Sequence, residues 1–361
     1  MASMNATGFA RYADLPPAVR EMAENFGATN PFMCGTWLRE FEARLLKPNE
    51  QACYVVVAAD ERPRLILPLI IETHRWLRVA KVRSMANFYT NIYAPVTNAG
   101  FEADDPAAIA QTLTDYLVDS FPRAALIELS PLRGETRLYA AMIDAFAAHG
   151  YATRRFGKTA NWHEPFTAAP SYDAYLAQRP GQLRSTLKRK SRLLERETQA
   201  RIDITGPAGD LDTALADFER VYADSWKPEE SHPEFIRAVM KHLIAADRAR
   251  AGILYVDEEP AAAQIWLRIG DHWGVFKLSY RPRFAKYSVG SLLTAAMIEE
   301  FLRMPDTRCI DFLSGDDAYK ADWVSVKGEH WGFECINTRS PWGKLLSWKR
   351  RLSNTSASNT S

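Results

Sequence analysis

The chain has 361 residues, of which 47% are hydrophobic, 25% are charged and 11% are aromatic. Its 45 Lys and Arg residues nearly balance its 44 Asp and Glu residues, so the formal net charge is +1. This composition is typical of a globular protein and excludes a disordered, collagen-like or low-complexity chain. The length suggests two domains, and the balanced charge gives no support to a protein that binds duplex DNA.

The sequence predicts neither a membrane span nor a secretory signal. Its longest apolar stretch, Leu65–Ile71, is far shorter than the ~20 residues that a spanning helix needs. The first residues lack the basic and apolar regions of a signal peptide. The four cysteines, Cys34, Cys53, Cys309 and Cys335, are widely separated, so we expect reduced, buried thiols in a cytoplasmic protein.

Hydrophobic periodicity predicts an alternation of strands and helices in the first half. The predicted elements are helices over 14–26 and 34–46, strands over 53–59, 64–73 and 82–93, a helix over 106–120, a strand over 124–129, a helix over 135–149, and strands over 151–156 and 161–166. The pair Asp104-Asp105 before Pro106 is a typical signal for a helix N-terminus.

The second half repeats this order. The predicted elements are a charged helix over 181–198, a strand over 201–205, helices over 210–226 and 233–246, strands over 252–256, 261–269 and 273–279, a helix over 291–303, a strand over 309–313, a short helix over 316–323 and a final strand pair within 326–338. Both halves therefore read strand–strand–strand–helix–strand–helix–strand, which suggests an internal duplication. Pro170 and Pro180-Gly181 indicate a boundary between Phe166 and Gln182, and Ser353–Ser361 is expected to be disordered.

Several common catalytic motifs are absent from the sequence. It contains no GxxxxGK[ST], GxGxxG, HExxH, CxxC or GxSxG pattern, and its seven histidines lack metal-ligand spacing. These absences argue against an ATPase, a dinucleotide-dependent oxidoreductase and a zinc hydrolase.

A strand, a small-residue turn and a helix start follow one another near residue 290. The loop Arg281–Tyr287 contains Arg283 and Lys286, and Ser288-Val289-Gly290-Ser291 then opens a helix. Unpaired N–H groups and the helix dipole at such a point can bind a phosphate, and glycine permits close approach. The simpler interpretation is an ordinary turn with a serine cap.

A second cluster follows the predicted strand Cys309–Leu313. After Ser314-Gly315 come Asp316, Asp317, Tyr319, Lys320 and Trp323. Open sheets often place their chemistry at the end of a strand. One aspartate could be a helix cap, but the whole group exceeds what a cap requires.

These segments carry a resemblance to a known family. The matching stretches are Ala262–Leu267, Lys277–Tyr280, Tyr287–Leu293, Asp311–Trp323 and, upstream, Leu183–Glu195. Together they resemble the GNAT acyltransferase domain of the CelD/BcsL-type family, which is associated with cellulose and exopolysaccharide biosynthesis. That family is similar to the Fem-type aminoacyl transferases, which also pair two GNAT-like halves. The match covers about residues 170–350, and residues 1–165 agree only in element order.

The resemblance implies an α/β (α+β) fold of tandem GNAT-like domains, each a mixed, mostly antiparallel sheet flanked by helices. The expected domains are 1–166, an N-terminal GNAT-like domain, and 167–340, the GNAT acyltransferase domain. Residues 341–361 are expected to form a basic amphipathic and disordered tail. The expected co-substrate is acetyl-CoA or another acyl-CoA, with no metal, and the acceptor is a sugar or sugar-lipid precursor.

The resemblance also implies roles for individual residues. Backbone N–H groups near Leu278, Ser279 and Tyr280 would stabilise the oxyanion, Tyr319 would be the general acid, and Asp317 or Asp316 would be the base, with Lys320 as a further catalytic residue. The coenzyme pyrophosphate would lie on Lys286, Tyr287, Ser288, Val289, Gly290 and Ser291. The acceptor would contact Gln264, Trp266, Lys277, Arg184, Lys188 and Trp323. The general [QR]xxGx[GA] loop is degenerate here, because Ala285, Ser288 and Gly290 occupy its defined positions.

Local charge leaves two alternatives open. The segment Arg184–Arg201 holds seven basic and two acidic residues, either as a solvated face or as a contact for phosphates. A Fem-like enzyme that uses aminoacyl-tRNA would need such a surface. A non-catalytic GNAT-fold regulator could bind a nucleotide through the basic end Lys344–Leu352. The same end could instead contact an anionic membrane, or polysaccharide-synthesis machinery at the inner face of the membrane.

Overall fold

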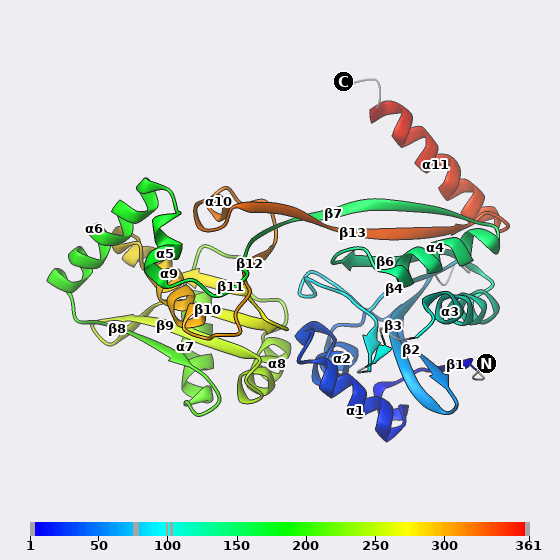
Figure 1. The fold of residues 1–361 in the computed structure, drawn as a ribbon, viewed down its shortest axis with the longest axis horizontal. Helices are drawn as coiled ribbons and strands as arrows, with labels where there is room; N and C mark the ends of the chain where they lie inside the picture. Colours follow the sequence, from blue (N-terminus) through cyan, green and yellow to red (C-terminus); the bar gives the residue numbers. More distant parts are fainter. Residues whose placement is uncertain (1–3, 75–78, 99, 102–103, 358–361) are drawn as a thin grey trace. The chain divides into compact units, whose positions relative to one another are not determined.

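The computed structural model describes residues 4–74, 79–98, 100–101 and 104–357. The chain forms two compact units, and the division between them is not a single point in the sequence. Unit 1 contains Met1–Gly27, Phe32–Thr159 and Glu329–Ser361, whereas unit 2 contains Ala28–Pro31 and Ala160–Gly328. Figure 1 shows the ribbon coloured along the chain.

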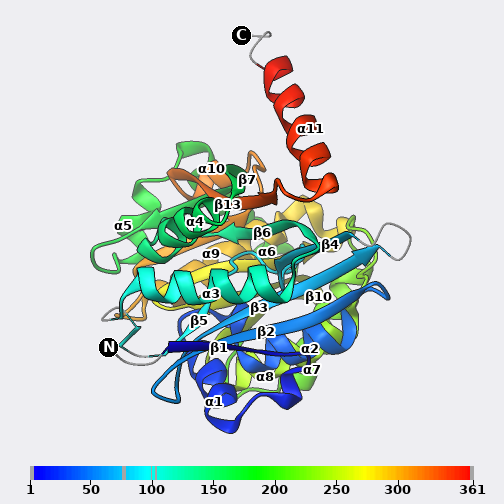
Figure 2. The ribbon, with the colours of Figure 1, turned by 90° about the vertical axis from the view of Figure 1, so that its right-hand side faces the viewer.

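The first part of the chain supplies most of unit 1. Its elements are β1 (Met4–Phe9), η1 (Tyr12–Asp14), α1 (Pro17–Phe26), η2 (Pro31–Met33), α2 (Gly35–Arg44), β2 (Glu50–Ala59), β3 (Arg62–His74), β4 (Val79–Ser84), β5 (Val96–Thr97), α3 (Pro106–Ser120), β6 (Ala124–Leu132) and α4 (Arg137–Ala148). Strands β1 to β4 pair antiparallel in sequence order, and β4 then pairs parallel with β6. Helix α3 packs against β1 and β2 (Figure 2).

Unit 2 repeats this succession. Its elements are α5 (Tyr172–Ala177), α6 (Gly181–Glu197), β8 (Ala200–Thr205), α7 (Leu211–Ala223), α8 (Pro233–Ala245), β9 (Ala249–Val256), β10 (Glu259–Ile269), β11 (His272–Tyr280), η4 (Pro282–Tyr287), α9 (Val289–Leu302), β12 (Cys309–Ser314) and α10 (Lys320–Trp323). Strands β8 to β11 pair antiparallel in sequence order, and β11 pairs parallel with β12.

Two long strands belong to both units. Strands β7 (Tyr151–Pro165) and β13 (Val326–Asn337), labelled in Figure 1, each run from one unit into the other. Strand β13 pairs with β6 in unit 1, and β7 pairs with β12 in unit 2. In element order β7 concludes the first repeat and β13 the second. The last strand of each repeat therefore pairs with a strand of the other repeat.

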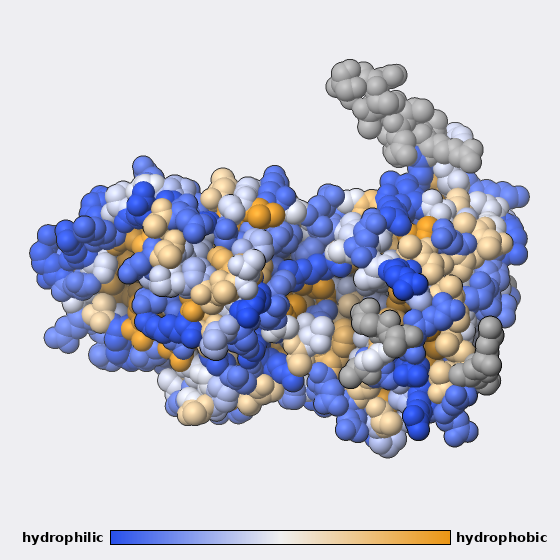
Figure 3. All heavy atoms as spheres, viewed as in Figure 1, coloured by the Kyte–Doolittle hydropathy of each residue, from blue (hydrophilic) through white to orange (hydrophobic). Residues whose placement is uncertain are grey.

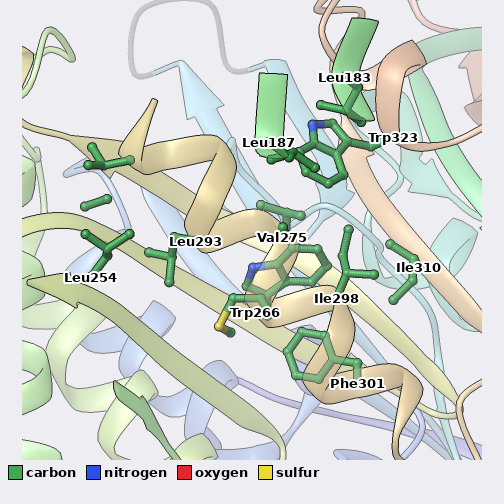
Figure 4. Close-up of a cluster of buried hydrophobic side chains, with 14 of the residues drawn as sticks. Leu183, Leu187, Leu254, Trp266, Val275, Leu293, Ile298, Phe301, Ile310 and Trp323 are labelled. Carbon is green, nitrogen blue, oxygen red and sulfur yellow. The ribbon is translucent and has the colours of Figure 1, made fainter. Parts of the chain in front are cut away.

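The core of unit 2 lies between its sheet and α9. Trp266, Trp273 and Phe301 are almost fully buried, and the rings of Trp273 and Phe301 stack with centroids 4.1 Å apart. Figure 4 shows Leu183 and Leu187 of α6 beside Trp323 of α10, next to this cluster. Helices α7 and α8 contact strands β9, β10 and β11, so helical side chains stabilise the sheet by burying its apolar residues.

Most predicted elements are present, with differences at their ends. Helix α3 has the predicted bounds, because Asp105 caps it and Pro106 begins it. The predicted strand 82–93 ends at Ser84 and begins earlier, at Val79. Strand β1 and helix α5 were not predicted. The two strand pairs predicted within 151–166 and 326–338 are single long strands.

The limits of the two units also differ from the domain boundaries predicted at 166/167 and 340/341, because β7 and β13 each contribute residues to both units. The predicted disordered tail is helical as far as Ala357, in α11 (Pro341–Ala357), and residues 358–361 lie outside the described residues. All four cysteines are free and buried, as expected. Among the described residues, no helix is long and apolar enough to cross a membrane.

Candidate functional site

Strands β11 and β12 separate before they end. Their parallel ladder joins His272 to Cys309 and finishes at Gly274 and Asp311. Strand β11 nevertheless continues to Tyr280 and β12 to Ser314. The C-terminal part of β11 therefore has a free edge that faces a gap in the described sheet of unit 2.

The backbone of β12 explains the separation. Leu313 has φ 49°, an unusual value for a non-glycine residue, and the β12–β7 register shifts between Asp311 and Ser314. The fully buried Asp311 holds this bend, because its Oδ1 accepts hydrogen bonds from Leu313 N–H and Asn161 Nδ2, both at 2.7 Å. The sharp bend turns β12 away from a regular ladder.

The free edge of β11 presents backbone donors. Arg281 N–H donates to Ala261 O in β10 at 2.8 Å. Successive N–H groups of a strand point to opposite edges, so those of Leu278 and Tyr280 point toward the gap. The Ser279 hydroxyl between them is buried and has no hydrogen-bond partner among the described residues. Backbone N–H groups are usually satisfied, so a bound ligand is a natural partner for those of Leu278 and Tyr280 at this edge.

The N-terminus of α9 lies beside this edge. A Cβ added to Gly290 would be 3.2 Å from Tyr280 Cδ1, so the first turn of α9 contacts the end of β11. Ser288 is the N-cap residue, with φ 57°, and its side chain makes no capping hydrogen bond. The N–H groups of Val289, Gly290 and Ser291 have no carbonyl to pair with inside the helix. The predicted phosphate-binding residues therefore form an uncapped helix end.

Gln264 and Trp266 position this helix end. Gln264 is 1% exposed, and its amide nitrogen donates to Gly290 O at 3.1 Å and to Thr294 Oγ1 at 2.7 Å. Trp266 Nε1 donates to Gln264 Oε1 at 2.8 Å, and its ring is buried. Both residues were predicted to contact the acceptor. Their burial and satisfied polar atoms instead assign them to supporting the first turn of α9.

The basic residues of the loop before α9 are engaged elsewhere. Lys286 lies 3.4 Å from Glu197 at the end of α6, and the hydroxyl of the buried Tyr287 donates to the same carboxylate. Arg283 pairs with Glu259. The side chains of Lys286 and Arg283 are both more than half exposed, so their ion pairs lie at the surface.

The acidic cluster after β12 divides into different environments. Asp316 pairs with Lys327 at 2.7 Å and accepts from Trp162 Nε1 at 3.0 Å, and these contacts lower the pKa of its carboxyl group. The Asp317 side chain is 65% exposed and lies 3.7 Å from Lys320 Nζ. Asp317 is therefore better suited than Asp316 to accept a proton.

Tyr319 is 41% exposed, and its ring packs edge-on against Phe312 of β12. Burial, followed by the charge of Asp317, raises the pKa of its hydroxyl well above the ordinary value. Tyr319 is therefore protonated at neutral pH, as an ordinary tyrosine is, and its raised pKa makes it a weaker acid.

Lys320 and Trp323 have structural contacts. Lys320 is buried, and its Nζ donates to the carbonyls of Phe312, Ser314 and Gly315 at 3.0, 2.8 and 3.2 Å. Trp323 is buried in the core, and its carbonyl accepts from Tyr175 and Arg179. The catalytic and acceptor-contact roles predicted for these two positions do not fit this burial. Lys320 instead fixes the bend at the end of β12, and the ring of Trp323 stacks with Phe312 in the core.

Lys277 lies near a cavity of about 490 Å³ between α7 and α8. Its ammonium group pairs with Glu230 and lies 5.0 Å from the centroid of the Tyr222 ring. Glu230, Tyr222 and Lys227 line the cavity, and sequence reasoning missed all three. The charged loop Trp226-Lys227-Pro228-Glu229-Glu230 between two predicted helices was the signal that could have indicated them.

Arg184 and Lys188 line a different cavity, of about 650 Å³, between α6, α9, β8 and β9. Its walls include the apolar residues Leu187, Leu254 and Leu292. Neither cation makes an ion pair in the described chain. Figure 3 shows mostly hydrophilic surface over the end of unit 2 that carries α6 in Figure 1. The structure thus places these two predicted acceptor contacts on a basic helix apart from Lys277.

Comparisons with known proteins agree with this geometry. Residues 181–321 match the family model described as the acetyltransferase (GNAT) domain. This range includes the open β11–β12 pair and the α9 end. The predicted α/β fold is confirmed, because both units combine mixed, mostly antiparallel strands with flanking helices in the same succession. No curated protein sequence matches the chain.

Solved structures resemble the chain over most of its length. A crystal structure of FemX has a TM-score of 0.58 at 11% identity, and the match covers 90% of this chain and 98% of that chain. L-PGS from Bacillus licheniformis gives 0.55 at 13% identity, covering 96% and 98%. The C-terminal domain of a putative lysylphosphatidylglycerol synthetase from Agrobacterium fabrum gives 0.54 at 11% identity, covering 91% and 94%. At these identities the similarity is one of fold.

Proposed function

We propose that unit 2 transfers an acyl group from an acyl-CoA thioester to an amine on a sugar or sugar-lipid precursor. The observation that carries the proposal is the free edge of β11 next to the uncapped N-terminus of α9. The family model of the acetyltransferase (GNAT) domain supports it, because that model matches the residues that build this pair of features.

The residues fit an acyl-CoA donor in two places. The N–H groups of Val289, Gly290 and Ser291 would bind the coenzyme pyrophosphate, since the helix dipole favours anions there. The N–H groups of Leu278 and Tyr280 would hold the donor along β11 and stabilise negative charge on the thioester oxygen. The donor supplies the electrophilic carbonyl, and the protein supplies position and hydrogen bonds.

The remaining steps are proton transfers. Asp317 accepts a proton from the acceptor ammonium, so that the free amine forms the new C–N bond while the C–S bond breaks. Tyr319 gives its proton to the leaving thiolate, which departs as the thiol, and the tyrosinate regains a proton from the nitrogen of the new C–N bond.

The experiment is a direct assay of binding and transfer. Purified protein is titrated with coenzyme A and acetyl-CoA by calorimetry and native mass spectrometry, and acetyl transfer to glucosamine is followed by thiol release. We expect binding and transfer, both lost in Gly290→Trp. The proposal is overturned if neither ligand binds and Gly290→Trp changes nothing.

A second candidate donor is an aminoacyl-tRNA. The basic surface of α6, where Arg184 and Lys188 make no ion pairs in the described chain, favours it, and the fold shared with FemX is compatible with it. Transfer from charged tRNA without transfer from acyl-CoA would select this candidate. A further proposal from the resemblance is a place in exopolysaccharide or cellulose-type biosynthesis, which identification of the natural acceptor would test.

A further inference from the structure

The cavity between α7 and α8 has an unusual distribution of charge. Its volume of about 490 Å³ is in the range of small-molecule sites. Phe218, Tyr222 and Ile236 form apolar walls, and three glutamates and one lysine supply charge. The charged residues differ in whether the protein already provides them with a partner.

Two of the glutamates are paired within the protein. Glu219 accepts two hydrogen bonds from Arg237, at 2.8 and 2.7 Å, and Glu230 pairs with the buried Lys277. Lys227 and Glu229 make no ion pair within the described chain, although both line the cavity. They are two residues apart on the loop between α7 and α8.

The Lys227 ammonium group is in an environment that lacks a neutralising contact. Burial, followed by repulsion from Lys277, lowers its pKa, and Lys320 adds further repulsion. The charges of Asp317 and Glu230 partly offset these effects. Its Nζ lies 5.9 Å from the centroid of the Tyr222 ring. An ammonium group in such a place is stabilised by an external anion.

Strand β11 connects the cavity with the proposed site. Lys277, the neighbour of Leu278 on this strand, has its Nζ 5.0 Å from the centroid of the Tyr222 ring, which lines the cavity. A molecule in the cavity therefore lies beside the strand that would hold the acyl donor. In this cavity an amine of the bound molecule would contact Glu229, and an anionic group would contact Lys227.

We infer that this cavity binds the acceptor and that the acceptor carries a carboxylate or phosphate besides its amine, with Lys227 as the residue that binds this anionic group. The inference rests on the proposed function in that it names the substrate class of the same unit. It makes Lys227 a specificity-determining residue, whereas Lys277 is held by Glu230.

The test separates anion binding from acyl transfer. Calorimetry measures the binding of glucose, glucose 6-phosphate and glucuronate, which lack an amine and cannot be acylated. We expect one or both anions to bind and glucose to bind at least roughly 10-fold more weakly. Lys227→Met should remove this difference, and Lys227→Arg should retain it. Lys241→Met is the matched control, because Lys241 is exposed on α8 and pairs with Asp212.

A second arm uses acceptors that differ in the same way. With an acyl donor, glucosamine 6-phosphate or 2-amino-2-deoxyglucuronate should have a lower KM than glucosamine, and Lys227→Met should raise that KM without lowering kcat. Comparing the KM of glucosamine 6-phosphate with that of 2-amino-2-deoxyglucuronate identifies whether the anionic group of the acceptor is a phosphate or a carboxylate. Thermal unfolding of each variant verifies that the fold is retained.

The outcomes distinguish the two proposals. Binding that depends on charge and on Lys227, without acyl transfer from any donor, would uphold the anion site and overturn the proposed function. Equal binding of the neutral and charged sugars, binding of none of them, or unchanged anion binding in Lys227→Met would overturn the inference.

Discussion

The same parallel strand pair is closed in unit 1 and open in unit 2. In unit 1 the β4–β6 ladder reaches Arg83 and Glu128, one residue before β4 ends. Ser84 and Ser130 continue the connection, because Ser84 Oγ donates to Ser130 O at 2.6 Å and accepts from Ser130 N–H at 2.8 Å. In unit 2 the corresponding β11–β12 ladder stops at Gly274.

The helix that follows the first strand of each pair, α3 in unit 1 and α9 in unit 2, differs in whether its N-terminus is capped. At α3 the Asp105 carboxylate accepts from Ala107 N–H at 2.9 Å and fills the positive end of the helix. At α9 the Ser288 side chain makes no such bond. A duplicated scaffold can thus retain its fold while one copy satisfies the backbone groups that the other leaves available for a ligand.

The largest expected effect comes from filling the open helix end. Gly290→Trp places an indole where Tyr280 and the proposed donor meet, so transfer should fall at least about 100-fold. Steady-state kinetics and coenzyme binding measure it. The matched control is Ala107→Trp at the second position of α3, which is exposed in unit 1 and should leave transfer unchanged. Equal losses in both variants would remove the functional distinction between the units.

The proposed acid should give the next largest effect. Tyr319→Phe removes the proton donor and should lower kcat about 100-fold with little change in KM. Because the pKa of Tyr319 is raised above its ordinary value of 10, the wild type should show no loss of kcat through tyrosine ionisation as pH rises toward 10. Unchanged kcat in the phenylalanine variant would exclude the role.

The bend of β12 depends on Lys320. Lys320→Met leaves the carbonyls of Phe312, Ser314 and Gly315 without this donor and should lower the free energy of unfolding by about 1–3 kcal/mol. Urea denaturation measures the change. Lys327→Met, at an exposed ion pair with Asp316, should cost less than about 1 kcal/mol. A stable Lys320→Met protein without activity would instead indicate a chemical role.

The two helix caps should give the smallest effect. Asp105→Ala should destabilise the protein by about 1 kcal/mol and leave transfer unchanged, because it removes the cap of α3. Ser288→Ala should cost less, since Ser288 makes no capping bond. Thermal denaturation compares the variants, and equal destabilisation by the two would contradict the assigned difference.

Local sequence signals predicted much of the fold and only part of the site. Asp105 and Pro106 define the start of α3, and the order of elements predicted the duplication. The end of β4 at Ser84 was not predicted, because an apolar sequence continues beyond it while the ladder does not. Periodicity also cannot name the partner of a strand, so the exchange of β7 and β13 required the structure.

Within the site, the uncapped start of α9 was predictable because glycine and small residues follow a strand. Gln264 was predicted to contact the acceptor, and only the packing of β10 against α9 reveals its bonds to Gly290 and Thr294. Lys227 belongs to no motif. Its significance comes from Lys277 and Lys320, which are distant in sequence and close enough in the fold to lower its pKa.

The exchange of β7 and β13 also bears on the history of the chain. A gene that encoded one repeat alone would leave its sheet without the strand that the other repeat now supplies. With this reciprocal pairing in place, loss of either copy would remove a strand from the sheet of the other. The first repeat, whose strand pair is closed, can therefore be retained without selection for catalysis, because the second repeat depends on its last strand, β7.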